Sequence, residues 1–362
     1  MKKVLWLTNI PSPYRVDFFN MLGLKVKLKV IFERKESSER KDSWYGNEFK
    51  HFDYVFLKGI KFGSDRSISI SVINHLCNNF DYIFISNPMT PTGMIASRFL
   101  RAFRIPFIIE GDGGFPKREE NCIIRQIKKS ALRGAHKYFS SGMQHSDYYE
   151  YYGVSSEKIL MYPFSSIKEE DILINPLSVE EKSKLRQKLS LPEGRIILYV
   201  GQFVYRKGLD ILFKALKEIQ IKYTLLLIGD SLEAFKKLEI DDHGVNYKVI
   251  GFMDKKNLNV YYDSSDFLVL TTREDIWGLV INEAFSRGLP VISSNCSGAA
   301  KQLIKNSVNG FKVSNEKNEE LVTKIEWMLS NELFSYSYHS LETIKSYTLE
   351  KMTEAHISFI NI

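Results

Sequence analysis

Cysteine is scarce in this sequence, and no apolar run is long enough to cross a lipid bilayer. The 362 residues contain three cysteines, which lie far apart and form no CxxC motif. We therefore expect neither disulfides nor a zinc site, as in proteins of reducing compartments. A membrane-spanning helix needs roughly 20 consecutive apolar residues, and the apolar run near the N-terminus is too short even for a signal peptide. The sequence thus predicts a cytoplasmic protein.

Patterns that bind metal ions are absent as well. The seven histidines show no metal-ligand spacing, and no Asp-x-Asp motif follows a predicted strand. Because carboxylate oxygens are the ligands that hard divalent ions prefer, we expect that the protein requires no metal or other cofactor. The histidines are then expected to be structural.

The composition is that of an ordinary globular protein, with 44% hydrophobic and 26% charged residues. The length of 362 residues is large for one hydrophobic core and suits two domains. The formal net charge of +7 is compatible with nucleic acid, an anionic membrane surface or anionic substrates as partners. Charge alone does not choose among these partners.

Strand and helix patterns alternate along both halves of the chain. The expected strands are at residues 4–8, 25–32, 55–57, 81–86, 106–110, 137–140, 196–200, 224–229, 245–250, 267–270, 291–293 and 311–313. The expected helices are at residues 14–22, 68–78, 93–103, 123–133, 143–152, 209–219, 232–238, 255–263, 319–329 and 347–360, with further helices ending at 189 and beginning near 279. This alternation predicts an α/β protein with parallel, doubly wound sheets.

The pattern is interrupted once, over residues 163–193, where prolines and a polar acidic segment intervene. We therefore predict one Rossmann-like domain over residues 1–165, with a C-terminal helix at 345–362 packing back on it, and a second over residues 166–344. Ligands of such folds bind at the carboxyl ends of the strands. The two domains are thus expected to face a cleft that holds the ligand.

The segment 270–298 places two acids around the start of a predicted helix. Asp275 lies in the loop before the helix, and Glu283 lies on its first exposed face, with seven residues between the two. The N–H groups of Gly278, Leu279 and Val280 lack helical partners and would attract an anion. Two carboxylates would repel a bare phosphate, so they more plausibly bind hydroxyls. A sugar nucleotide carries both a phosphate for the amides and hydroxyls for the carboxylates.

A second candidate anion site follows the strand at residues 196–200. Gly201 permits a turn at the strand end, and Arg206 and Lys207 follow before the next helix. Arginine supplies a planar fork of donors and lysine a point charge, which together suit a diphosphate. A solvated loop is the alternative for the basic pair alone. The second anion site, one strand edge away, favours a functional role.

These motifs resemble a known enzyme family. The runs VGQFVYRKGLDIL, LLLIGD and GFMDKKNLNVYYDSSDFLVLTTREDIWGLVINEAFSRGLPVISSNCSGAAKQLIKNSVNGF are similar to the C-terminal half of retaining family 4 glycosyltransferases, which have the GT-B fold. The resemblance covers roughly residues 195–313 and is highly specific, because the loops, their order and their spacing all agree. It implies that Arg206 and Lys207 hold the diphosphate of a nucleotide-sugar donor.

The same resemblance assigns the other donor contacts. Asp275 would bind hydroxyls of the donor hexose and Glu283 the ribose, while the amides at 278–280 would meet sugar and phosphate. Gly251 and Phe252 would flank the base. The family usually has Glu at the first acid position. Because Asp275 is shorter by one methylene, either the sugar is placed differently or Glu274 shares the role.

The amino-terminal half matches more loosely. NIPSPYRVDFFNMLG resembles the opening of a bacterial branch of these enzymes that serves surface-polysaccharide pathways. Many relatives have a histidine in the loop after the strand that here reads IPFIIEGDGGF. In its place we predict Asp112 as the catalytic, acceptor-side residue, with Glu110 as the alternative, although GDGG as a simple turn is an equal reading. Asn9 and Arg15 would reach the cleft, or Arg15 is a solvated residue at a helix start.

The segment 117–137 is basic and amphipathic. Its basic residues are Lys117, Arg118, Arg125, Lys128, Lys129, Arg133 and Lys137, and its apolar residues include Ile123, Ile124, Ile127, Ala131 and Leu132. Such a helix suits an anionic membrane surface, which a lipid-linked acceptor would require. Packing on its own sheet is the commoner role of such helices. Nucleic acid is a poor alternative, since no recognised binding motif accompanies the charge.

Together these patterns predict a retaining hexosyltransferase. It would move a hexosyl group from a nucleoside-diphosphate sugar to a glycan or polyprenyl-linked acceptor, at the inner face of the cell membrane. Two alternatives stay open: a sugar-nucleotide epimerase of the same fold, and a non-catalytic sugar-nucleotide-binding protein.

Overall fold

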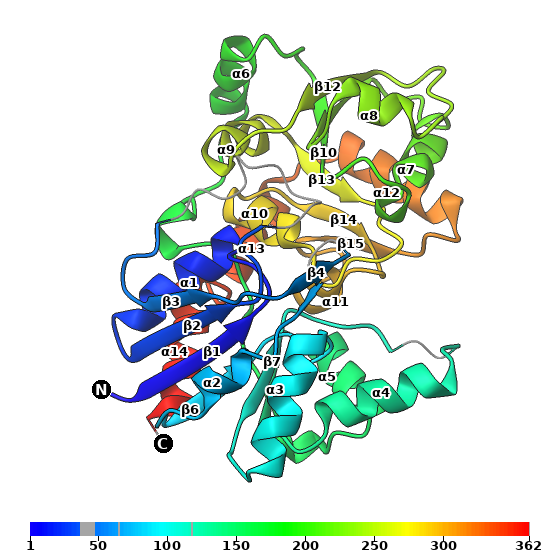
Figure 1. Cartoon of the computed structure of the whole chain (residues 1–362). Helices are drawn as coiled ribbons and strands as arrows, with labels where there is room; N and C mark the ends of the chain where they lie inside the picture. The colour runs from blue at the N-terminus through cyan, green and yellow to red at the C-terminus, as the bar shows by residue number, and fades with distance from the viewer. Residues whose placement is uncertain (37–47, 64–65, 117–118, 362) are drawn as a thin grey trace. The chain divides into compact units, whose positions relative to one another are not determined.

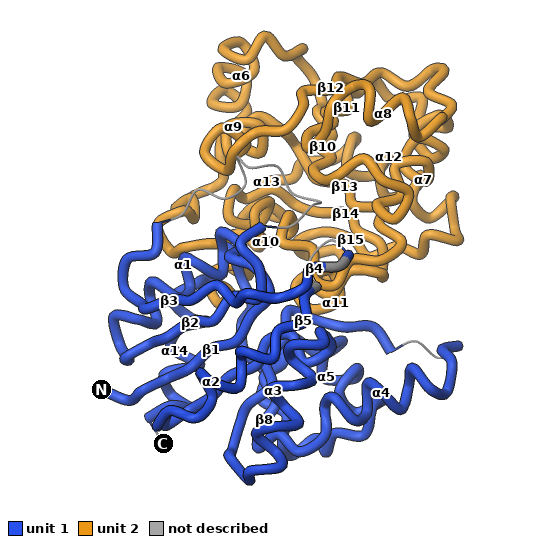
Figure 2. The backbone as a smooth tube through the Cα atoms, in the orientation of Figure 1, with its two compact units in different colours: residues 1–166, 348–362 blue, residues 167–347 orange. Residues whose placement is uncertain are grey.

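The computed structural model describes residues 1–36, 48–63, 66–116 and 119–361. The chain folds into two compact units (Figure 2). Unit 1 comprises Met1–Ser166 and Thr348–Ile362, and unit 2 comprises Ile167–Tyr347. The chain thus returns to its first unit at its C-terminal end.

Unit 1 contains a seven-stranded parallel sheet in the order β3-β2-β1-β6-β7-β8-β9. These strands are β1 (Lys3–Thr8), β2 (Lys27–Phe32), β3 (Asp53–Phe56), β6 (Tyr82–Ile85), β7 (Ile108–Gly111), β8 (Lys137–Ser140) and β9 (Ile159–Met161). The chain adds strands on one side of β1 and then crosses to β6 on its other side. This reversal is the topological switch point, where open α/β sheets bind ligands.

Helices cover both faces of this sheet because successive side chains of β1 point to opposite faces. Leu5 and Leu7 pack in one apolar cluster with residues of α2 (Val72–Leu76), α3 (Pro91–Ala102) and α5 (Met143–Tyr151). Trp6 points the other way and contacts α1 (Pro13–Gly23) and the last helix, α14 (Leu349–Ile360). These two helices lie side by side (Figure 1). The C-terminal helix is therefore part of the core of unit 1.

Unit 2 repeats the architecture with a six-stranded parallel sheet in the order β12-β11-β10-β13-β14-β15. Its strands are β10 (Arg195–Val200), β11 (Tyr223–Ile228), β12 (Tyr247–Gly251), β13 (Phe267–Leu270), β14 (Val291–Ser294) and β15 (Gly310–Val313). Its helices are α6 (Val179–Lys188), α7 (Leu209–Leu216), α8 (Leu232–Lys236), α9 (Lys255–Ser264), α10 (Leu279–Ser286), α11 (Gly298–Leu303), α12 (Asn318–Ser330) and α13 (Phe334–Ile344). The switch point of this sheet lies between β10 and β13.

The α/β class with two Rossmann-like units is confirmed, but several local predictions were wrong. The helix expected at 68–78 is the short α2, because the preceding residues form an antiparallel hairpin of β4 (Ile60–Phe62) and β5 (Arg66–Ile68). Ser67 and Ser69 are both buried there, and Ser69 Oγ donates to the Lys58 carbonyl (2.7 Å). Alternation of serine and isoleucine in this segment is therefore a strand pattern. Strand β9 and helices α11 and α13 were not expected.

No helix in the described residues is long and apolar enough to span a bilayer.

Candidate functional site

The basic loop of unit 2 lies against the segment that follows β13. Gly208 has a left-handed backbone (φ +68°), and a Cβ atom there would lie 2.0 Å from the carbonyl oxygen of Thr271. The Thr271 hydroxyl in turn donates to the Gly208 carbonyl (2.7 Å). Because only glycine fits this approach, the loops after β10 and β13 are held side by side.

Arg273 fastens the same two loops, although the sequence patterns gave no reason to select it. Its guanidinium donates to both carboxylate oxygens of Asp210 (2.8 and 2.6 Å) and lies 3.8 Å from the ring centre of Tyr205. Its backbone N–H donates to the Arg206 carbonyl (2.8 Å). The paired guanidinium lowers the pKa of the Asp210 carboxyl below its ordinary value. The turn that carries the basic pair is therefore fixed from the β13 side.

The predicted basic pair meets the loop that carries Asp275. Lys207 Nζ lies 2.5 Å from Asp275 Oδ2, and each side chain is only about 15% exposed. Arg206 Nη1 donates to the carbonyl oxygen of Glu274 (2.7 Å), whose own side chain is half-buried. The backbone N–H of Asp275 donates to the Cys296 carbonyl (2.9 Å). Lys207 and Asp275 thus form an ion pair, and hydrogen bonds from Arg206 and to Cys296 hold the loop around it in place.

Helix α10 begins beside this ion pair, at Leu279 as expected. Gly278 precedes it with φ +97°, and a Cβ atom there would lie 2.6 Å from Ser297 Oγ. Within the described part of the chain, the N–H groups of Gly278, Leu279 and Val280 donate no hydrogen bond. Unpaired amides at a helix start attract anions.

Glu283 lies one turn into α10, but it is half-buried rather than on an exposed face. The cause is Tyr262 of α9, whose hydroxyl donates to Glu283 Oε2 (2.9 Å). Burial raises the pKa of the Glu283 carboxyl, while the Tyr262 hydrogen bond and the charge of Lys255 act in the opposite direction. Tyr262 was not predicted, because nothing in its sequence position distinguishes it from a core tyrosine.

Gly201, Gly229 and Gly251 end three neighbouring strands of the unit 2 sheet. Gly229 donates to the Gly251 carbonyl (3.0 Å), and a Cβ atom on Gly229 would lie 2.2 Å from the Gly201 carbonyl oxygen. Phe252 follows Gly251 and is 40% exposed. The residues expected to flank a base therefore lie at the same sheet edge as the basic loop.

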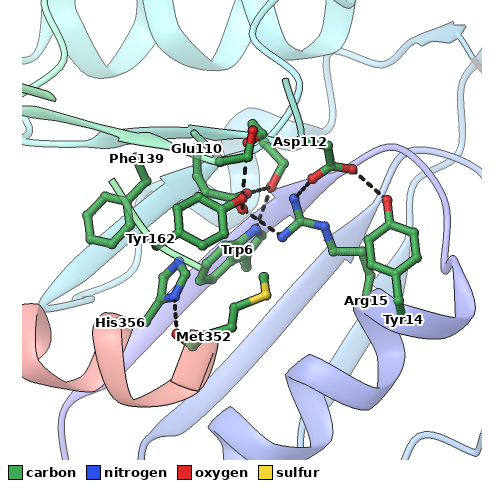
Figure 3. A network of polar contacts seen from close by, with 12 residues as sticks. Trp6, Tyr14, Arg15, Glu110, Asp112, Phe139, Tyr162, Met352 and His356 are labelled. Atoms are coloured by element: carbon green, nitrogen blue, oxygen red, sulfur yellow. Dashed lines mark hydrogen bonds and ion pairs between the residues drawn. The ribbon is translucent and has the colours of Figure 1, made fainter. Parts of the chain in front are cut away.

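Unit 1 holds a second polar cluster, centred on Arg15 (Figure 3). Its guanidinium forms ion pairs with Glu110 (Nη1 to Oε1, 2.8 Å) and with Asp112. Tyr14 donates to Asp112 Oδ2 (2.5 Å). Arg15 is 2% exposed, so the expectation of a solvated helix-start residue is wrong. The GDGG loop is likewise more than a solvated turn.

The two acids of this cluster differ in access. Glu110 is fully buried and accepts hydrogen bonds from Tyr162 (2.5 Å) and Ser86 (2.7 Å). The Asp112 side chain is 34% exposed. Asn9, at the end of β1, is half-buried and accepts from the Ile10 N–H (2.8 Å). Only Asp112 of the two predicted acids can meet a ligand in this arrangement.

Two histidines are buried in unit 1. Burial lowers the pKa of His145 and of His356 to about 3. His145 packs against the backbone of Gly111, and His356 lies among aromatic rings that include Trp6 and Phe139. Among the described residues no group of three or more His, Cys, Asp or Glu is arranged to hold a metal ion.

Helix α4 (Cys122–Leu132) carries its charges differently from the prediction. Lys117 and Arg118 lie outside the described residues. The Arg125 guanidinium lies 4.7 Å from the Tyr151 ring centre, and Lys128 contacts Glu120 (2.6 Å) and the Tyr152 hydroxyl (2.9 Å). Ile123, Ile124 and Ile127 are exposed, at 65%, 49% and 41%, as are Cys122, Gln126 and Arg133. Arg125 and Lys128, two of the residues expected to contact lipid, therefore have partners within unit 1. The exposed residues Ile123, Ile124 and Ile127 form an isoleucine ridge.

Comparison with known proteins gives these clusters a context. Residues 181–347 match the family Glycosyl transferases group 1. The chain is 30% identical over 194 residues to an uncharacterized glycosyltransferase of Haemophilus influenzae, covering 50% of this chain and 53% of that protein. It is 24% identical to a GalNAc-alpha-(1->4)-GalNAc-alpha-(1->3)-diNAcBac-PP-undecaprenol alpha-1,4-N-acetyl-D-galactosaminyltransferase of Campylobacter jejuni, over half of each chain. The chain thus spans about half the length of the curated relatives it matches.

The fold comparison covers the whole chain. The structure of Anabaena Alr3699/HepE in complex with UDP and glucose superposes with a TM-score of 0.77, at 16% identity and over 100% of both chains. The two Rossmann-like units are therefore those of the GT-B fold. The comparisons therefore support the resemblance of the sequence to GT-B glycosyltransferases.

The contacts of Arg273 lead to a prediction about the basic loop. Arg273→Lys should speed amide exchange of Lys207 and Gly208 about tenfold, because lysine cannot replace a stacked, two-bond guanidinium worth on the order of 1.4 kcal/mol. Hydrogen–deuterium exchange measures this. Arg287→Lys, which alters a similar pair with Asp263 in the same unit, is the control. Equal exchange of the Lys207 and Gly208 amides in both variants would contradict the role of Arg273 in holding the basic loop.

Proposed function

We propose that the protein is a retaining hexosyltransferase of family 4 that uses a nucleoside-diphosphate sugar and acts in surface-polysaccharide synthesis. The observation that carries this proposal is the group formed by Arg206, Lys207, Asp275 and the free amides of α10. It lies at the switch point of unit 2, within the segment that matches the glycosyl transferases. A cation, a carboxylate and unpaired N–H groups together suit a ligand with both phosphates and hydroxyls.

In this proposal unit 2 binds the donor. Arg206, Lys207 and the amides at 278–280 stabilise the diphosphate as negative charge develops on it during departure. Asp275 accepts hydrogen bonds from sugar hydroxyls while it keeps Lys207 in place. Glu283, oriented by Tyr262, binds the ribose. The UDP and glucose named for the Anabaena structure support a nucleotide sugar as donor.

Unit 1 supplies the acceptor side. Asp112 is the half-exposed acid at the carboxyl edge of its sheet, and we assign it to the acceptor hydroxyl. A glycan or polyprenyl-linked acceptor is supported by the name of the Campylobacter relative, which includes an undecaprenol-linked substrate. Retention of anomeric configuration is carried over from the family resemblance.

The role of Lys207 can be tested by Lys207→Ala. We expect the affinity for UDP to fall between about tenfold and 100-fold, since a hydrogen bond to a charged group is worth about 1.5–3 kcal/mol, and turnover to fall by orders of magnitude. Calorimetry and a transfer assay measure these effects. The melting temperature should fall by some degrees, because the largely buried Asp275 loses its ion-pair partner, but backbone bonds still hold the Asp275 loop.

Lys217→Ala is the matched control for this variant. Lys217 pairs with Asp241, an exposed residue of the same unit outside the basic loop. Unaltered UDP affinity in Lys207→Ala would remove the lysine from the diphosphate site.

The same arrangement predicts transfer without a divalent ion. Cationic side chains and helix amides supply the positive charge that a metal would otherwise provide for the leaving diphosphate. Transfer from a panel of nucleotide sugars should therefore continue in EDTA. Activity that EDTA abolishes and Mg²⁺ or Mn²⁺ restores would reject the metal-free account. Donor epimerisation in this screen would point to the epimerase alternative instead.

Peripheral contact with an anionic membrane is part of the proposal, with the contact now assigned to the isoleucine ridge of α4. Replacing Ile123, Ile124 and Ile127 by serine should weaken binding to phosphatidylglycerol vesicles about tenfold or more, because their apolar surface no longer leaves water. Sedimentation with vesicles measures this. Ile174→Ser, which alters an exposed isoleucine of unit 2, should bind as the unaltered chain does. Equal binding of the triple variant would return α4 to a packing role.

A further inference from the structure

Arg15 of unit 1 has one more acidic partner than its charge requires. The guanidinium is buried, and a buried charge is costly unless it is paired. Glu110 already supplies one full negative charge at 2.8 Å. Asp112 adds a second carboxylate on the other side of the guanidinium. A network with a purely structural purpose would not need this surplus negative charge.

The network fixes Glu110 and leaves part of Asp112 open. Glu110 is fully buried, and Arg15, Tyr162 and Ser86 all contact its carboxylate. Asp112 uses one oxygen for Arg15 and the other for Tyr14. A carboxylate has about four acceptor positions, so two remain, and the side chain is 34% exposed. Asp112 can therefore accept further hydrogen bonds.

The location of Asp112 favours a ligand. Tyr14 and Arg15 form the first turn of α1, which follows β1, and Asp112 directly follows β7 (Figure 3). The strand between these two is β6, so the cluster borders the switch point of the sheet. An anionic acceptor of hydrogen bonds at this place would repel phosphate and attract the hydroxyls of a sugar.

We propose that Tyr14 and Arg15 are positioning residues, which orient the Asp112 carboxylate so that its free edge binds a hydroxyl of the acceptor sugar. This inference rests on the proposed function and deepens its acceptor side. Glu110 is the buried counter-charge that keeps Arg15 in place, and Tyr162 and Ser86 keep Glu110 in place. Arg15 thus acts through Asp112 and touches no substrate itself.

The electrostatics of the cluster give the proposal a pH dependence. Burial raises the pKa of the Asp112 carboxyl, Arg15 lowers it, Glu110 raises it and the Tyr14 hydrogen bond lowers it. Tyr149 of α5 and Tyr162 after β9 also face this charge. Sugar binding by the ionised carboxylate is lost as the pH falls through this pKa. Removing a group that lowers the pKa moves that loss to higher pH.

The experiment measures binding of methyl hexosides and methyl N-acetylhexosaminides by saturation-transfer NMR between pH 4 and 8. Asp112→Asn should weaken binding tenfold or more. Tyr14→Phe should weaken it about threefold to tenfold and shift the acidic loss of binding to higher pH. Arg15→Lys keeps the positive charge but removes the paired N–H donors of the guanidinium. It should also shift the acidic loss of binding to higher pH.

Tyr162→Phe is the matched control, since it removes a hydrogen bond from Glu110 and none from Asp112. It should leave the pH profile unmoved even where it lowers the melting temperature. An unshifted profile in Tyr14→Phe, an equal shift in Tyr162→Phe, or no Asp112-dependent sugar binding in the unaltered chain would overturn the proposal.

The proposed function is tested separately by UDP affinity and by transfer. UDP affinity should be equal in all of these variants, because the donor residues lie in unit 2. Transfer should fall in the variants that weaken sugar binding. An unaltered chain that binds sugars through Asp112 but transfers none would reject the transferase and keep the positioning role.

Discussion

The close contact between Gly208 and the Thr271 carbonyl is the constraint on which the charged group of unit 2 depends. It leaves no room for a side chain between the loops after β10 and β13. The adjacent strands bring both loops to one edge, and the contact fixes their separation. Arg273 then adds a two-bond pair with Asp210 and a stacked ring. Lys207 and Asp275 meet because of this packing, although 68 residues separate them.

Each unit has a charged cluster beside the switch point of its sheet, and the two clusters carry opposite net charge. In unit 2, one lysine balances Asp275, and Arg206 and the helix amides add positive potential, which suits a diphosphate. In unit 1, two carboxylates share one guanidinium, which leaves a net negative charge and suits hydroxyls. The proposed transfer from a phosphorylated donor to a polyol acceptor would use this difference in charge.

In α4, the exposure of the basic residues and the isoleucines differs from what the sequence pattern predicts. Basic residues interleaved with isoleucines predict a helix with its charges in contact with lipid. In the structure the Arg125 guanidinium lies against the Tyr151 ring, and Lys128 contacts Glu120 and the Tyr152 hydroxyl within unit 1. The isoleucines are exposed instead. A membrane contact of this helix would therefore begin with apolar surface, and the remaining basic residues would assist it.

The sequence by itself determined the α/β class, most strands and the motifs at 201–208 and 275–283, because apolar periodicity and turn residues are local signals. It did not determine the hairpin at 60–68, where Ser67 is buried and donates to the distant Glu33 carbonyl. Tertiary structure alone decided that Arg15 is buried between two acids, that Glu110 is inaccessible and that Tyr262 orients Glu283. Arg273 and Tyr14 belong to this group too. Their partners come from other strands and helices, so no spacing along the chain can reveal them.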